Sequence, residues 1–113
     1  MKYGSDDILK KFQALMNDVK KSVPGQYEAF IQSKNAMTGK GRISQKMKWL
    51  LLLVAGVSQK CPVCIPRAVK HCLDAGWSKD EMIEACMVAV LVGGASVMTY
   101  ALLAVNSINK IRR

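Results

Sequence analysis

An uncharged apolar run constrains this chain more than any other feature. Residues 85–105 contain no charged side chain over 21 positions, a length that can cross a bilayer. The small and polar residues at 93–96, followed by Thr99, weaken that interpretation, although membrane helices tolerate small residues. A helix that is apolar on all sides can instead be covered by neighbouring helices or other subunits. Because 113 residues cannot easily hide both this run and residues 49–57 in one monomer, we expect a homo-oligomer with no membrane span. A basic membrane-associated protein is the alternative.

The first half of the chain is patterned for three helices. Ser5 with two following aspartates is typical of a helix start, and apolar residues then recur at helical spacing to about Ser22. Pro24 can open a second, short helix. After a glycine-containing turn at 39–41, Ser44 can cap a third helix that ends near Ser58.

The second half predicts further helices. Pro66 would remove a hydrogen bond in a helix interior, so a helix is expected to begin at Cys64 or Ile65 and to end near residue 75. Ser78 and Glu81 form a capping-box pattern before a helical stretch to about residue 109, with a kink or break at 93–94. No convincing strand appears. We predict an all-α fold of about six helices in a single domain, residues 1–113.

The net charge of +9 is unevenly distributed. Residues 1–48 hold ten Lys or Arg against four acids, residues 49–109 hold four of each, and Lys110, Arg112 and Arg113 complete the excess. Basic segments can bind phosphate backbones, but no set of stacking aromatics and no nucleic-acid motif accompanies them. We therefore expect no nucleic-acid partner.

Cys61-Pro62-Val63-Cys64 is the motif most able to carry chemistry. Two thiols at this spacing can close a disulfide, and a helix start favours the attacking thiolate. Two small buried hydrophobic residues are the simpler interpretation. Zinc requires further ligands, and the candidates are His71, Cys72 and Cys86, none well placed for it. We favour a redox pair and expect no metal and no cofactor.

Three other residues are possible auxiliaries to this pair. Lys60 and Arg67 would lower the pKa of a nearby thiol, whereas apolar surroundings would raise it. His71 is the only histidine, and it lies about 10 Å from Cys64 by helix rise, too far for a direct hydrogen bond. It is either a base that reaches the cysteines of a neighbouring subunit or a surface or interface residue whose hydrogen bonds are already made.

The chain resembles the carboxymuconolactone decarboxylase superfamily over residues 24–108, and within it the alkylhydroperoxidase (AhpD-like) branch. The features that carry the resemblance are spaced in order: residues 41–46, an apolar helix, 61–65, 76–85 and 93–94. The resemblance implies an all-helical subunit, assembly into trimers or hexamers, and reduction of hydroperoxides or disulfides. It also implies that Cys64 attacks peroxide, that Cys61 resolves the sulfenic acid, and that a thiol or lipoyl donor restores the pair.

The family's proton relay does not carry over. Its histidine lies four residues after the second cysteine, where this chain has Ala68. Its glutamate lies twelve residues before the first cysteine, where this chain has Trp49. Positioned proton transfer contributes about 10²–10⁴-fold in rate, so we expect weak or altered turnover. A non-catalytic oligomeric redox-sensing or binding module is the alternative function. Without a visible secretory signal, we expect a reducing, cytoplasmic setting.

Overall fold

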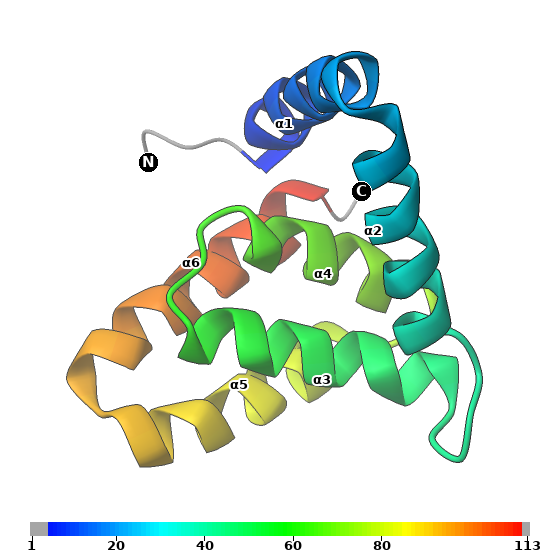
Figure 1. Cartoon of the computed structure of the whole chain (residues 1–113). Coiled ribbons are helices and arrows are strands. Elements are labelled where there is room, and N and C mark those ends of the chain that lie inside the picture. The colour runs from blue at the N-terminus through cyan, green and yellow to red at the C-terminus, as the bar shows by residue number, and fades with distance from the viewer. Residues whose placement is uncertain (1–4, 112–113) are drawn as a thin grey trace.

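Six helices make up the described part of the chain, and Figure 1 shows their arrangement. The computed structural model describes residues 5–111, and within them the chain is all-α with no strand. Its six helices are α1 Ser5–Ser22, α2 Pro24–Thr38, α3 Gln45–Ser58, α4 Cys64–Asp74, α5 Lys79–Gly93 and α6 Ala95–Ile111. Arg112 and Arg113 of the predicted basic tail lie outside the described residues.

The helix boundaries follow local capping chemistry. The Ser44 hydroxyl accepts a hydrogen bond from the Met47 N–H at 3.1 Å and starts α3. Ser78 and Glu81 form both bonds of the predicted capping box at the start of α5. Pro24 lies in the first turn of α2, as predicted, but α2 runs for 15 residues and is not short.

The apolar run at 85–105 is divided between two helices. Gly94 ends α5 with a φ of 76°, a backbone conformation that residues other than glycine rarely adopt. The chain therefore turns back, and α5 and α6 pack on each other as a hairpin. No described helix combines the length and apolarity that a membrane span requires.

Four helices, α3–α6, enclose the core. α3 packs against α4 and α5, and α6 packs against α4 and α5 (Figure 1). The buried apolar residues come from all four helices: Leu53, Val57, Ile65, Ala68, Val69, Cys72, Met82, Cys86, Ala89, Val97, Ala101, Ala104 and Ile108.

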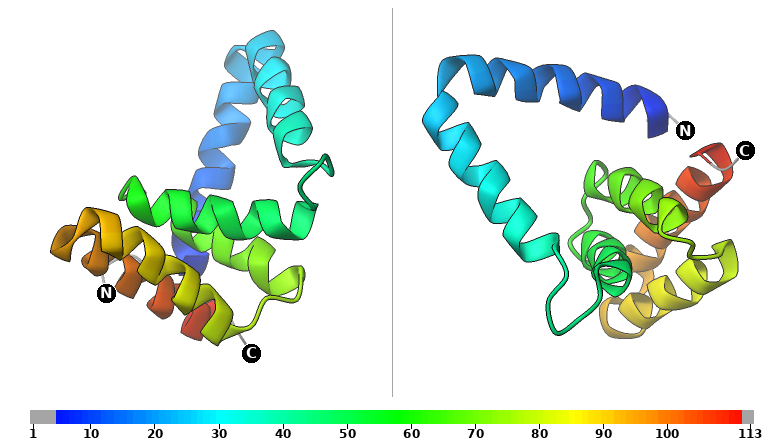
Figure 2. Two further views of the ribbon diagram at one scale, coloured as in Figure 1. Left: turned by 90° about the horizontal axis from the view of Figure 1, so that it is seen from below. Right: turned by 90° about the vertical axis from the view of Figure 1, so that its right-hand side faces the viewer.

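The first two helices form an arm outside this bundle. Figure 2 shows α1 and α2 meeting at an angle, to one side of the other four helices. α2 contains no buried residue, and Phe30 is 56% exposed. A second apolar surface lies at the end of the α5–α6 hairpin, where Leu91 is 85% and Val92 87% exposed. Such surfaces are typical of contacts with another protein or another subunit.

Candidate functional site

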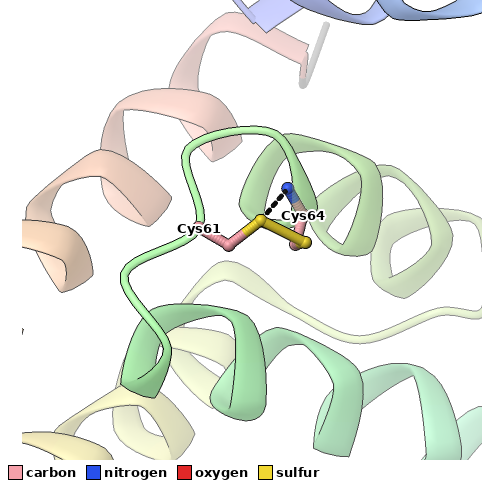
Figure 3. The surroundings of a disulfide bond; sticks show 2 residues. All are labelled: Cys61 and Cys64. Atoms are coloured by element: carbon pink, nitrogen blue, oxygen red, sulfur yellow. Dashed lines mark hydrogen bonds between the residues drawn. A yellow bond between two sulfur atoms is a disulfide. The ribbon is translucent and has the colours of Figure 1, made fainter.

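Cys61 and Cys64 lie where the chain enters α4, and Figure 3 shows the disulfide that joins them. Their Cα atoms are 5.3 Å apart, within the usual range for a disulfide. Cys64 is the first residue of α4 and is exposed, whereas Cys61 in the preceding loop is half-buried. Pro66 is in the first turn, where its missing N–H leaves no helix bond unmade. The predicted start of this helix is confirmed.

The loop before the pair depends on a tight chain reversal after α3. The Cys61 N–H donates to the Gly56 carbonyl at 3.0 Å, and Lys60 takes a φ of 57°. A Cβ added to Gly56 would lie 3.3 Å from the Cβ of Cys64. Gly56 therefore allows α3 to pass directly beneath the cysteine pair. Sequence reasoning missed this residue, although a glycine inside an apolar helix often marks close packing.

The two cysteines have different surroundings at the start of α4. The Cys64 N–H donates to Cys61 Sγ at 3.1 Å (Figure 3). In the reduced pair the same N–H would stabilise a Cys61 thiolate, because a hydrogen bond to the charged form favours that form. Cys64 is the more exposed residue and so the one that an external reagent reaches. Attack at Cys64 with Cys61 as the leaving or resolving thiolate is the chemistry that this geometry favours.

Trp49 of α3 and His71 of α4 stack against each other. Their ring centroids are 4.1 Å apart and their planes 10° apart. Trp49 is at the position where the predicted resemblance places a glutamate, and His71 follows Ala68 by one helical turn. The pKa of His71 is lowered, first by burial and then by the nearby positive charge of Lys34, so the imidazole is mainly neutral at pH 7. No sequence signal predicts this stack, because the two residues lie on different helices.

The three predicted auxiliaries lie in two different surroundings. Lys60 is exposed in the loop before Cys61. Arg67 and His71 both line a cavity between α4 and the α1–α2 arm.

The other two cysteines are buried in the bundle as free thiols. Burial raises the pKa of Cys72 to about 12 and that of Cys86 to about 11. Both are therefore protonated at neutral pH and poor nucleophiles. Within residues 5–111, no three His, Cys, Asp or Glu side chains are gathered in a way that could hold a metal ion.

An all-helical subunit with a Cys-x-x-Cys disulfide at the start of a bundle helix defines a class of small thiol-containing helical proteins. The comparisons place the chain within it: residues 24–107 match the model of the carboxymuconolactone decarboxylase family, and the protein belongs to that family. The predicted resemblance is confirmed, and the cysteine pair is consistent with the AhpD-like branch.

Solved structures of family members are similar over nearly their whole length. A carboxymuconolactone decarboxylase family protein from Legionella pneumophila has 23% sequence identity and a TM-score of 0.93, with 96% of this chain and 97% of that chain covered. A family protein from Thermotoga maritima, described with a suggested involvement in an antioxidative response, has 26% identity and a TM-score of 0.83, with 94% and 90% covered. No protein with a curated description matches the sequence.

Proposed function

We propose that this protein is a thiol-dependent oxidoreductase that reduces small hydroperoxides or disulfides with Cys61 and Cys64. The observation that carries the proposal is the disulfide at the start of α4, with an exposed Cys64 and a Cys61 sulfur that accepts the Cys64 N–H. The description of the Thermotoga maritima relative supports an antioxidant role.

With a hydroperoxide, the Cys64 thiolate attacks the terminal oxygen of the O–O bond. The O–O bond breaks, the alkoxide leaves and takes up a proton to become an alcohol, and Cys64 becomes a sulfenic acid. Cys61 then attacks the Cys64 sulfur, water leaves, and the disulfide forms. The peroxide gains two electrons and the two thiols lose them.

An external dithiol, such as a lipoyl group, or two monothiols complete the cycle. A donor thiolate attacks Cys64, and Cys61 leaves as a thiolate next to the Cys64 N–H. A second donor thiol then releases Cys64, so that the donor carries the new disulfide. A small disulfide substrate would be reduced by the same steps in reverse.

Proton handling favours disulfide exchange over peroxide reduction. Ala68 and Trp49 offer no acid–base group at the two relay positions, and His71 is stacked on Trp49. Expulsion of an alkoxide from a peroxide needs a proton in the transition state, whereas a Cys61 thiolate can leave without one. We propose that peroxide turnover is slow and that disulfide exchange is the faster reaction.

The same substitutions favour a second candidate function, an oligomeric redox-sensing or binding module without turnover. The exposed Leu91 and Val92 support assembly as a homo-oligomer, which we propose to be a trimer or hexamer. A thiol pair that needs a reductant, together with two free cysteines, fits a reducing, cytoplasmic compartment.

The test uses fully reduced protein and a Cys64→Ser control. Consumption of cumene hydroperoxide and of oxidised glutathione is followed with a regenerating dithiol, and intact mass is recorded after each oxidant. We expect consumption above the control and a reversible loss of about 2 Da as the disulfide closes. Consumption no faster than Cys64→Ser would refute the enzyme and leave the sensing module. If no reversible disulfide forms either, both candidate redox functions fail.

A further inference from the structure

A second potential site lies between the arm and the bundle. A half-open cavity of about 450 Å³ is lined by residues of α1, α2 and α4, whose arrangement is seen in Figure 2. Neither Cys61 nor Cys64 lines it. Its volume lies in the range of small-molecule sites in proteins.

Positively charged residues from all three helices line this cavity. They are Lys10 from α1, Lys34 from α2, and Arg67 and Lys70 from α4. Asp74 is the one carboxylate that lines the cavity among the residues that the structure describes. Since like charges repel one another, an anion bound among these side chains would relieve the repulsion.

The pKa of His71 indicates the same excess of positive charge in the cavity. Its pKa is lowered first by burial and then by Lys34, with smaller contributions of the same sign from Arg67 and Lys70. Asp74 acts in the opposite direction and does not offset them. The imidazole therefore lies in a positive field made by side chains that are far apart in the sequence.

The cavity also has an apolar and aromatic wall. Met16, Tyr27, Phe30 and Ile31 line it on the arm side. Phe30 is 56% exposed in the absence of any occupant. An apolar ligand body placed there would remove aromatic surface from water.

We infer that this cavity binds a small organic carboxylate whose aromatic or short acyl body lies against Tyr27 and Phe30. The Arg67 guanidinium presents a planar pair of donors that matches a carboxylate, and the lysines add positive charge around it. This inference goes beyond the proposed redox function, because the ligand is held and does not react.

The test compares two compounds that share a phenyl group on a short alkyl chain and differ in the head group, which is a carboxylate in one and a neutral alcohol in the other. We titrate the protein with 4-phenylbutyrate and with neutral 4-phenyl-1-butanol, using calorimetry and the amide NMR signals of Tyr27, Phe30 and His71. We expect binding of the carboxylate, signal shifts at these residues, and affinity that falls as salt is added. Equal binding of the alcohol, binding of neither compound, or signal shifts confined to other residues would overturn the inference.

Variants distinguish binding in the cavity from a general effect of the protein's net charge. Arg67→Gln is expected to weaken 4-phenylbutyrate binding about tenfold, the usual scale of one charge-assisted hydrogen bond. Arg67→Lys should retain part of the affinity. Lys11→Gln, on the exposed side of α1 and outside the cavity, removes the same charge and is the matched control.

Helical circular dichroism and sedimentation are recorded for each variant. An equal loss of affinity in Lys11→Gln would show that net charge alone is responsible. If Arg67→Gln changes the oligomeric mass and the unaltered protein binds no carboxylate, a second copy of the chain occupies the cavity instead. Either result would refute the proposed ligand site.

Discussion

After reduction, the four cysteines are expected to divide into two pairs with very different alkylation rates. Burial raises the pKa of Cys72 from 9.0 to about 12 and that of Cys86 from 9.0 to about 11. At pH 8, about one in ten exposed thiols of ordinary pKa is a thiolate, against about one in 10³ for Cys86 and one in 10⁴ for Cys72. Because only the thiolate reacts, alkylation should be slower than at such an exposed thiol by about 10²-fold at Cys86 and 10³-fold at Cys72.

The assay is iodoacetamide labelling of the reduced native protein, with peptide mass spectrometry at successive times. Labelling in urea is the control, since all four thiols are then exposed and should react at similar rates. Cys64 should be labelled first, because it is exposed at the start of α4. As pH rises from 9 towards 12, labelling of Cys72 should keep increasing about tenfold per unit, whereas an ordinary thiol levels off.

One outcome would refute the reasoning. If Cys72 is labelled within tenfold of Cys64 at pH 8 while circular dichroism shows an intact fold, burial does not suppress its thiolate. The core assignment of Cys72 and the selection of Cys61 and Cys64 as the reactive pair would then both be wrong.

Three further predictions concern the fold and the ring stack. Gly94→Ala should lower the free energy of unfolding by about 1–3 kcal/mol in urea denaturation, because φ 76° and ψ −154° suit glycine alone; an unchanged midpoint would contradict the hairpin geometry. In a Trp77→Phe background, Trp49 fluorescence should change as His71 gains a proton, with a midpoint below pH 6.5 because burial lowers its pKa; a midpoint above 6.5 would contradict this. Ser78→Ala should remove about 1 kcal/mol of stability by urea denaturation, and an effect below about 0.3 kcal/mol would mean that the capping box contributes little.

The helix boundaries were predictable because their causes are local. Ser44, Ser78 and Pro24 act on backbone groups within one turn of themselves, so their effect is visible in the sequence. The break at Gly94 was predictable for the same reason. The length of α2 was not, since its sequence has little apolar periodicity and none of its residues is buried.

The candidate site was predictable only in part. The spacing of Cys61 and Cys64 is short enough to predict a disulfide from the sequence, whereas the unequal exposure of the two residues is a property of the folded chain. The stack of Trp49 on His71 joins α3 to α4, and Gly56 brings α3 beneath Cys64. Each depends on how two helices pack, which no local pattern specifies.

The sequence by itself determined an all-helical chain with a thiol pair at a helix start, because helix capping, apolar spacing and the reach of two cysteines operate within a few residues. The tertiary structure decided which cysteine of the pair is the more exposed and which other cysteines are buried. It also gathered Lys34 of α2 with Arg67 of α4 around one cavity, although the two residues lie far apart in the sequence. The physical reason is that burial and electrostatic field depend on distances in space, which are set by the packing of helices that lie far apart along the chain.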